Sequence, residues 1–283
     1  METWNDMEIS NSYAWTADGQ QKRKNCPMLP RNIRGLIVGK SGCGKTTLLI
    51  NLLLQPDWLD YNHLYVFGKS LHQPEYKILR KGLESGLSKE QIANIFKKQQ
   101  DVLKLVLDPL KLIDSYIEEG GEAHGSIKAN FYDDCSDQIP DPTELNDQEK
   151  NLLILDDCLL EKQTKSEAYY TRGKHNNCDT FYISQNYFRL PRQTIRENAN
   201  LIILFPQDSK NITHIHADHC AADMSIKEFK DFCHTVWSKV YNFVTIDLSS
   251  TKFNGKYRQN FDTFFFPDIY KQKGESVSYN PDV

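Results

Sequence analysis

The sequence of 283 residues lacks the features of several protein classes. It has no basic excess, because 34 Lys and Arg stand against 38 Asp and Glu, giving a net charge of −4. A protein that simply coats nucleic acid usually carries such an excess, so any DNA contact must be local, through a few Lys or Arg on loops. No apolar stretch reaches the roughly 18 residues that span a bilayer, and the polar N-terminus is unlike a signal peptide. We therefore expect an intracellular protein without a membrane segment.

Paired cysteines are missing as well. None of the seven cysteines has a CxxC partner, and an odd number without a framework predicts reduced thiols in an intracellular compartment. One cluster could suggest zinc; it comprises His214, His216, His219 and Cys220. With no CxxC pair nearby to complete a metal site, packing or solvent exposure is the preferred interpretation.

The remaining composition and pattern indicate an α/β protein. Hydrophobic residues make up 39% of the chain and charged residues 25%, which allows a sizeable core. Short apolar runs, separated by helix-length polar segments, predict strands at 33–38, 63–67, 152–155, 180–183, 201–205 and 243–246. Alternating strands and helices predict a central, mostly parallel sheet flanked by helices on both faces.

The chain is predicted to divide around one large domain. The predicted parts are an N-terminal extension (1–30), an α/β domain (31–268) and a flexible C-terminal tail (269–283). Within the domain, residues 69–150 form a polar insertion that we expect to be helical and, toward its end, acidic. A capping box at 88–91 marks the start of one helix in it, and a second helical pattern follows Pro109.

A glycine loop directly after the first predicted strand is the strongest motif. It consists of Gly39, Lys40, Ser41, Gly42, Cys43, Gly44, Lys45 and Thr46, followed by Thr47. The pattern G-x-x-x-x-G-K-S/T is matched without a mismatch. Its glycines let backbone N–H groups point at a phosphate, and the N-terminus of the next helix adds its positive end. Lys45 is expected to bridge the β- and γ-phosphates of a nucleoside triphosphate, and the Thr46 hydroxyl to bind Mg²⁺.

Polar residues at the ends of two later strands are candidates for the chemistry. Asp156 and Asp157 end the run that begins at 152. Asp156 is expected to hold Mg²⁺ through its water shell. Asp157 is expected to polarise or deprotonate a water, which favours hydrolysis over transfer. Gln185 follows the strand at 180–183, where it is expected to reach the γ-phosphate or the attacking water.

Four arginines are candidates to complete the site of a neighbouring subunit. An arginine supplied in this way neutralises charge in the transition state. Arg172 is the first choice and Arg196 the second, while Arg189 and Arg192 remain open. Each of them, taken alone, is also typical of a solvated surface arginine.

Taken together, these motifs resemble the viral genome-packaging ATPases, which include the poxvirus-type enzyme and its relatives in Polinton (Maverick) elements. That family belongs to the FtsK–HerA class of P-loop ATPases. The resemblance rests on the glycine loop, the Asp156-Asp157 pair, and the segments 170–177, 184–188, 190–200 and 205–208. It runs from about residue 31 to about residue 265 and is weakest across the insertion.

The resemblance implies a RecA-like P-loop NTPase of the ASCE division that binds ATP and Mg²⁺. It also implies a ring of identical subunits, hexameric in form, that threads double-stranded DNA into a capsid by ATP hydrolysis. Capsid proteins would then be partners, and the protein would act in the host nucleus or at the viral assembly site, or be virion-associated. One departure is Asp157, since FtsK–HerA enzymes commonly have Glu there, and the shorter aspartate needs a closer water.

Other functions remain open. A conjugation or chromosome-segregation pump lies within the same class. A nucleotide or nucleoside kinase would instead have an arginine-rich lid and an acceptor pocket, and the acidic pair with Gln185 argues against it. A GTPase switch or a passive scaffold is disfavoured because the sequence has no Asn-Lys-x-Asp segment and no Leu-Ser-Gly-Gly signature.

Overall fold

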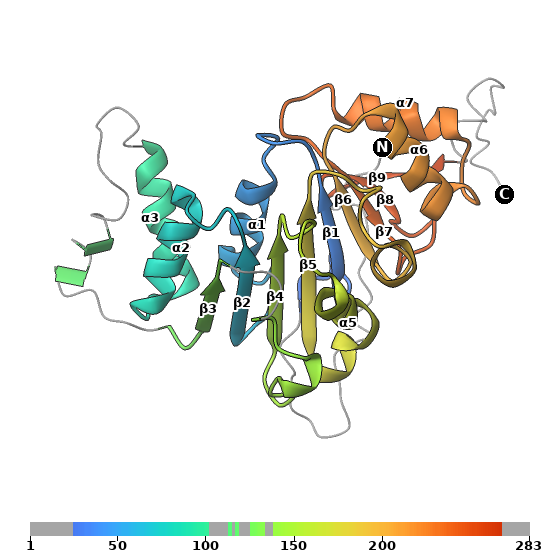
Figure 1. The fold of residues 1–283 in the computed structure, drawn as a ribbon. Coiled ribbons are helices and arrows are strands. Elements are labelled where there is room, and N and C mark those ends of the chain that lie inside the picture. Colours follow the sequence, from blue (N-terminus) through green and yellow to red (C-terminus); the bar gives the residue numbers. More distant parts are fainter. Residues whose placement is uncertain (1–24, 102–112, 115–116, 119–124, 134–137, 268–283) are drawn as a thin grey trace, which may run out of the picture.

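A computed structural model describes residues 25–101, 113–114, 117–118, 125–133 and 138–267 (Figure 1). Within these residues a nine-stranded sheet has the order β3-β2-β4-β5-β1-β6-β7-β8-β9. Its strands are β1 (Arg34–Val38), β2 (His63–Gly68), β3 (Lys128–Tyr132), β4 (Asn151–Asp156), β5 (Cys178–Ser184), β6 (Leu201–Leu204), β7 (Val244–Asp247), β8 (Tyr257–Gln259) and β9 (Thr263–Phe265). Strands β1 to β6 pair in parallel and β7 to β9 pair antiparallel. The predicted α/β fold with a mostly parallel sheet is confirmed.

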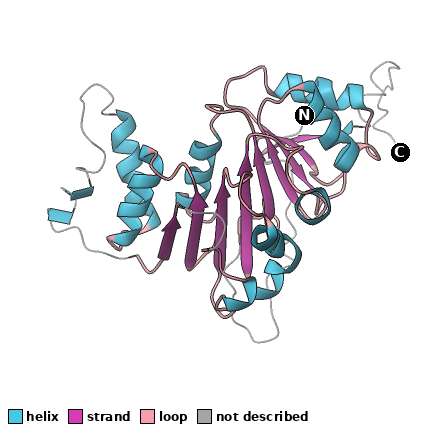
Figure 2. Cartoon of the chain, in the orientation of Figure 1, coloured by secondary structure: helices cyan, strands magenta, loops and turns pink. Residues whose placement is uncertain are grey.

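Helices cover both faces of this sheet (Figure 2). They are α1 (Lys45–Leu54), α2 (Pro74–Glu84), α3 (Lys89–Asp101), α5 (Thr164–Arg172), α6 (Ser209–Ile215) and α7 (Ile226–Val236). Side chains alternate between two apolar layers along each strand, so Ile37 lies with the residues of α1 to α3, while Leu36 and Val38 lie with those of α5 to α7. This two-sided burial explains why the central strands read as continuous apolar runs.

Helix α1 begins directly after Gly44, the last glycine of the loop, and its carboxyl-terminal half is buried in the core. Its buried side chains are Leu49, Ile50, Leu52, Leu53 and Leu54. The helix ends at Gln55, whose backbone is extended because the following residue is Pro56, and a residue before proline is disfavoured in the helical region. The expected buried helix after the glycine loop is therefore present.

The insertion at 69–150 contributes a strand as well as helices. Helices α2 and α3 lie in it, and the predicted capping box forms, because Ser88 Oγ accepts from Gln91 N at 3.2 Å and Gln91 Oε1 accepts from Ser88 N at 2.7 Å. Strand β3 pairs in parallel with β2 at the edge of the sheet. From the sequence we predicted only helices in the insertion and did not predict this strand. Only Phe131 of this strand is buried, so the sequence carries little apolar signal. The second predicted helix falls largely outside the described residues.

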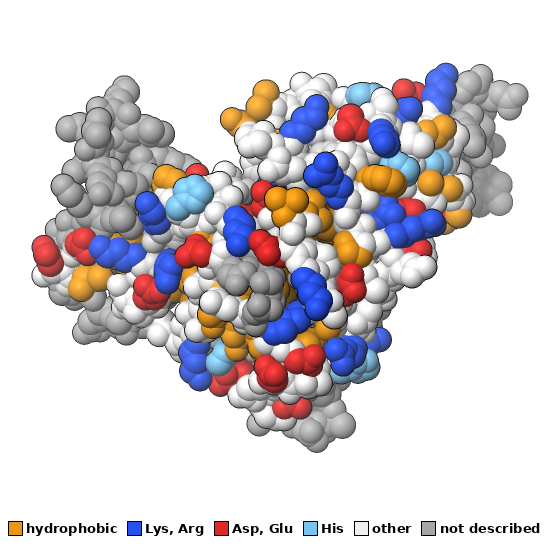
Figure 3. Space-filling view, viewed as in Figure 1, with side chains coloured by type: hydrophobic (Ala, Val, Ile, Leu, Met, Phe, Trp, Pro, Cys, Tyr) orange, Lys and Arg blue, Asp and Glu red, His pale blue; other side chains and the backbone are white. Residues whose placement is uncertain are grey.

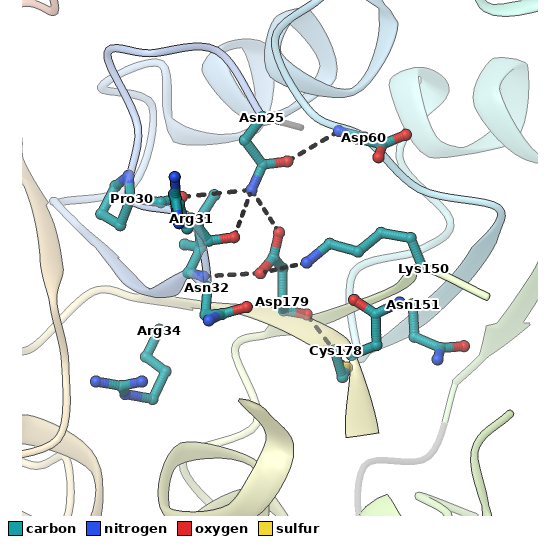
Figure 4. Close-up of polar contacts among 12 residues, drawn as sticks. Asn25, Pro30, Arg31, Asn32, Arg34, Asp60, Lys150, Asn151, Cys178 and Asp179 are labelled. Carbon is teal, nitrogen blue, oxygen red and sulfur yellow. Dashed lines mark hydrogen bonds and ion pairs between the residues drawn. The ribbon is translucent and has the colours of Figure 1, made fainter. Parts of the chain in front are cut away.

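Residues 25–30, the part of the predicted N-terminal extension that the structure describes, are fixed to the sheet (Figure 4). The amide of Asn25 donates to Asp179 Oδ2 at 2.6 Å, and its oxygen accepts from Asp60 N at 2.9 Å. The buried Asp179 also pairs with Lys150 Nζ at 3.0 Å. Burial raises the pKa of Asp179, while Lys150 and the hydrogen bonds oppose that shift. The start of the described chain is thereby tied to the amino end of β5.

Two further findings concern the cysteines and the membrane. Cys158 is disulfide-bonded, so the expectation that all cysteines are reduced thiols is wrong at that position. In the part of the chain that the structure describes, the free thiols are Cys26, Cys43, Cys178, Cys220 and Cys233. Among the residues that the structure describes, no helix has the length and apolar character needed to cross a bilayer.

Candidate functional site

Three neighbouring strands deliver the predicted site residues to one edge of the sheet. The glycine loop follows β1, the acidic pair lies at the end of β4, and Gln185 follows β5, in the spatial order β4-β5-β1. Ligands of such sheets bind at the carboxyl ends of the strands. A cavity of about 740 Å³ at this edge is lined by Lys45, Thr46 and Thr47 from one side and by Asp156, Asp157 and Gln185 from the other. Lys45 and Asp156, which are 111 positions apart in the sequence, therefore share one cavity with Gln185.

Glycine is required where the loop begins. A Cβ at Gly39 would lie 2.5 Å from Cys43 Sγ and 2.6 Å from Phe205 Cβ, which no real side chain tolerates. Gly42 and Gly44 have φ values of 74° and 102°, a left-handed region that side chains disfavour. The loop therefore turns tightly enough to bring several backbone N–H groups to one side, as a phosphate cradle needs.

Lys45 has its ammonium held at the mouth of the loop. Its Nζ donates to the carbonyl of Gly39 at 2.6 Å and to that of Lys40 at 2.8 Å. The helix that starts at Lys45 has no side-chain cap, so the N–H groups of its first turn have no partner within the helix. A positive charge and free backbone donors thus point at the same cavity, which is the requirement for binding a phosphate.

Asp156 is a buried carboxylate with one strong partner. Its residue is 6% exposed, and its Oδ2 accepts a hydrogen bond of 2.7 Å from the hydroxyl of Tyr76 on α2. Burial raises the pKa of Asp156; the Tyr76 bond and Lys45 lower it, and Asp157 raises it. Gly68 lies opposite in β2, and a Cβ there would lie 3.0 Å from the Asp156 carbonyl oxygen and 3.1 Å from its Cβ, so the two strands pack closely at this point.

Asp157 leaves the strand in an unusual conformation. Its φ is 56°, which is uncommon for a residue other than glycine and is enriched in Asp and Asn. Its N–H donates to the carbonyl of Ile183 at 3.1 Å, and Gln185 Nε2 lies 3.5 Å from its Oδ2. The turn directs Asp157 and Gln185 to the cavity together.

The donor set of the cavity fits a magnesium nucleotide. Thr46 offers a hydroxyl and Asp156 a carboxylate, both hard oxygen donors of the kind that Mg²⁺ prefers. The described residues hold no group of three or more His, Cys, Asp or Glu that could bind a metal by themselves. Mg²⁺ is usually held by one or two protein oxygens together with waters and substrate phosphates.

Three residues that line the cavity, and one that is hydrogen-bonded to Asp156 without lining it, are not part of the sequence motifs. Tyr76 lies 80 positions from its partner Asp156, in a polar stretch of the insertion where a single tyrosine has no recognisable pattern. On the opposite side of the glycine loop the cavity is lined by Phe205, Tyr241 and Phe243. Phe205 and Phe243 lie at the ends of the predicted strands 201–205 and 243–246, so their positions at the edge of the sheet could be expected. No pattern in the sequence indicates a role for Tyr241.

The candidate arginines lie outside the cavity. Arg172 ends α5 and is exposed, and it pairs with Asp141 at 3.4 Å. The short helix after it leads into the amino end of β5, so the end of α5 lies toward the amino ends of the strands, away from the glycine loop at their carboxyl ends (Figure 1). Arg172 can act on a nucleotide only in a neighbouring subunit. Arg196 is 5% exposed and pairs internally with Asp218 at 3.2 Å, which removes it as an alternative.

The histidine cluster is explained by packing. His214 stacks on Phe188 with ring centroids 4.4 Å apart. His219 Nε2 lies 2.7 Å from the hydroxyl of Tyr187, and burial lowers its pKa to about 4. Cys220 is fully buried. These side chains therefore make packing and hydrogen-bonding contacts within the described part of the chain.

The glycine loop after β1, the acidic pair at the end of β4 and the order β2-β4-β5-β1-β6 define the P-loop NTPase fold. Solved structures with a similar fold include the genome packaging NTPase B204 from Sulfolobus turreted icosahedral virus 2 in complex with AMP, at 13% identity and a TM-score of 0.46 over 81% of this chain and 96% of that one. VirB4 of Thermoanaerobacter pseudethanolicus is similar at 12% identity and a TM-score of 0.43, over 90% of this chain and 96% of that one. No protein-family model and no curated protein matches the sequence.

Proposed function

We propose that this protein hydrolyses ATP with Mg²⁺ and uses the energy to move double-stranded DNA. The observation that carries the hydrolytic part is the convergence of Lys45, Asp156, Asp157 and Gln185 on one cavity. Two carboxylates and an amide opposite a phosphate-binding lysine suit attack by water, whereas a kinase needs an acceptor site in place of that water.

Each side chain has a distinct part in the proposed reaction. Lys45 leaves the carbonyls of its own loop and neutralises charge on the β- and γ-phosphates. Mg²⁺, held by Thr46 and through water by Asp156, would supply further positive charge to the leaving group. Asp157 accepts a hydrogen bond, and then a proton, from the attacking water. The Gln185 amide, 3.5 Å from Asp157 Oδ2, orients the same water and registers whether the γ-phosphate is present.

The finer proposal is a ring-forming motor that packages a viral or Polinton-like genome into a capsid. It is supported by the sequence resemblance to the packaging ATPases and by the exposed position of Arg172, away from its own cavity. On the face drawn in Figure 3, basic and acidic side chains are interspersed, which agrees with DNA contacts made by a minority of Lys and Arg. We place its action inside the host cell, in the nucleus or at the site of virus assembly.

The test is ATPase activity with and without double-stranded DNA, in parallel with the oligomeric state from sedimentation. We expect hydrolysis that DNA stimulates and that salt weakens steeply, together with an assembly larger than a dimer. Lys45→Ala is the inactive control. If the protein is a monomer at micromolar concentration and DNA does not change its ATPase activity, the proposed motor function is refuted, while the proposed ATP hydrolysis is not.

Mixing two inactive variants tests the role of Arg172. In a mixed ring, an Arg172→Ala subunit supplies an intact Lys45, and a Lys45→Ala neighbour supplies an intact Arg172. We expect the mixture to regain activity that neither variant has alone. No recovery, in mixtures shown to co-assemble, would reject Arg172 as the arginine that acts across the interface.

Another DNA pump of the FtsK–HerA type is the second candidate, since the same site would serve it. The resemblance at 190–200 and 205–208 favours packaging. An assay of DNA movement distinguishes the two: a packaging motor transports DNA through an isolated capsid portal, whereas another DNA pump only translocates along free DNA. Phosphate transfer to added nucleosides would revive the kinase alternative.

A further inference from the structure

Tyr241 occupies a defined position beside the glycine loop. It lies in the turn before β7 and lines the nucleotide cavity. Its Cδ1 is 3.3 Å from the point where Gly44 would carry a Cβ, so its ring lies against the outside of the loop. The side chain is 69% exposed, and its backbone has a φ of 65°. A large, exposed aromatic ring held in this way against a phosphate loop has no role in the hydrolytic site described above.

The sheet order gives a bound triphosphate a direction. The acids after β4 and Gln185 after β5 mark the γ-phosphate end, and the glycine loop after β1 is the next structure along the edge. Beyond the loop come the segments after β6 and before β7, which carry Phe205 and Tyr241. A nucleotide that has its γ-phosphate at Asp157 and its β-phosphate in the loop therefore carries its base toward Tyr241.

Tyr241 is the ring in this part of the cavity with a face free to receive a base. Phe205 is 1% exposed and Phe243 is 7% exposed, and the two pack on each other with centroids 5.4 Å apart. They form the floor behind Tyr241. The far end of the cavity, beyond the acids, is lined by Ser70, Gln73 and Glu75, which offer no aromatic surface and one carboxylate that disfavours a nearby phosphate.

We propose that the face of Tyr241 stacks on the purine base of the bound nucleotide. The inference rests on the proposed ATP binding and adds the subsite for the base. Stacking uses the π-face that every base has and favours the larger purines over pyrimidines. Tyr241 thus sets nucleotide affinity through the base, while the glycine loop sets it through the phosphates.

The experiment compares two ligands that share the phosphates but differ in the base. Binding of a non-hydrolysable ATP analogue and of inorganic tripolyphosphate, both with Mg²⁺, is measured by calorimetry on the full chain. Tyr241→Ala is the test variant, because alanine and tyrosine both disfavour a φ of 65° and the backbone cost is matched. Tyr241→Phe keeps the ring. Phe253→Ala is the control, since Phe253 is a similarly exposed aromatic, at 62%, outside the cavity lining.

We expect Tyr241→Ala to bind the ATP analogue about tenfold more weakly, in the range of aromatic stacking on a base, and to bind tripolyphosphate as the wild type does. Tyr241→Phe and Phe253→Ala should stay within about twofold for both ligands. In Tyr241→Trp, the analogue should quench the fluorescence of the added indole, and tripolyphosphate should not.

Unchanged affinity of Tyr241→Ala for the analogue would overturn the proposal, as would an equal loss for both ligands, which would show that Tyr241 merely supports Gly44. Either result is compatible with a wild type that hydrolyses ATP. A wild type that binds neither ligand would overturn the proposed function as well, so the two failures are distinguishable.

Discussion

Removing the hydroxyl of Tyr76 is the perturbation with the best-defined consequence. In Tyr76→Phe the buried carboxylate of Asp156 loses a 2.7 Å hydrogen bond and keeps its burial. A hydrogen bond to a charged group contributes about 1.5–3 kcal/mol, so we expect the free energy of unfolding at pH 8 to fall by about that amount. Because this bond also lowers the pKa of Asp156, its loss raises that pKa further and disfavours the ionised form that binds Mg²⁺.

A double-mutant cycle with Asp156→Ala isolates the interaction. Urea denaturation of the wild type, both single variants and the double variant gives the coupling free energy. In the Asp156→Ala background the hydroxyl has lost its partner, so Tyr76→Phe should cost nothing or stabilise. The expected coupling is therefore at least about 1.5 kcal/mol. In the single variant Tyr76→Phe, which keeps Asp156, the Mg²⁺ concentration for half-maximal ATPase activity should be higher than in the wild type.

Tyr61→Phe is the matched control for that cycle. Tyr61 is equally buried, but its hydroxyl donates to the neutral carbonyl of Leu53 at 2.9 Å. It should cost about 1 kcal/mol, show no coupling to Asp156 and leave the Mg²⁺ dependence unchanged. A coupling below about 0.5 kcal/mol between Tyr76 and Asp156 would refute the view that the insertion positions this carboxylate.

Three other predictions test different parts of the molecule. Asp157→Asn should lower hydrolysis by about 10²–10⁴-fold while affinity for the ATP analogue stays within about twofold, since asparagine tolerates a φ of 56°; an equal loss of binding would contradict the assigned role. His219 has its pKa lowered to about 4, so the unfolded chain takes up its proton first and stability is lost as the pH falls from about 6.5 toward 4. Urea denaturation should show His219→Gln lacking about 2 kcal/mol of the wild-type loss between pH 7 and pH 5, and identical pH slopes would count against it. Asn25→Ala, measured in the same way at pH 7.5, should cost about 1–3 kcal/mol because Asp179 is left buried with one donor fewer; a neutral effect would mean that residues 25–30 are not anchored as described.

The central strands and the glycine loop could be predicted because their signals are local. Strands β1, β4, β5 and β6 are buried on both faces, so each appears as a short apolar run. The positions of Lys45 and of the acidic pair then follow from the rule that ligands bind at the carboxyl ends of parallel strands. Their convergence in one cavity was predictable, while their individual roles stay predictions.

Features that depend on distant partners could not be predicted. Edge strand β3 has one buried residue, and β8 and β9 have three residues each, too few to show a period. Tyr76 gains its importance only because α2 brings it to a carboxylate 80 positions away. In the same way, Asn25 is fixed by Asp179, 154 positions along the chain. Hydrogen bonds between residues so far apart in the chain cannot be predicted from a single sequence.

The central claim is that one cavity binds a nucleoside triphosphate with Mg²⁺ between the glycine loop and the two acids at the end of β4, Asp156 and Asp157. A crystal structure with a non-hydrolysable ATP analogue and Mg²⁺ tests it most directly. The account predicts the γ-phosphate between Lys45 Nζ and Asp157, with Mg²⁺ about 2.1 Å from Thr46 Oγ1 and reached by Asp156 through water. A triphosphate bound elsewhere, or one whose metal lies on the far side of the loop from Asp156, would contradict it.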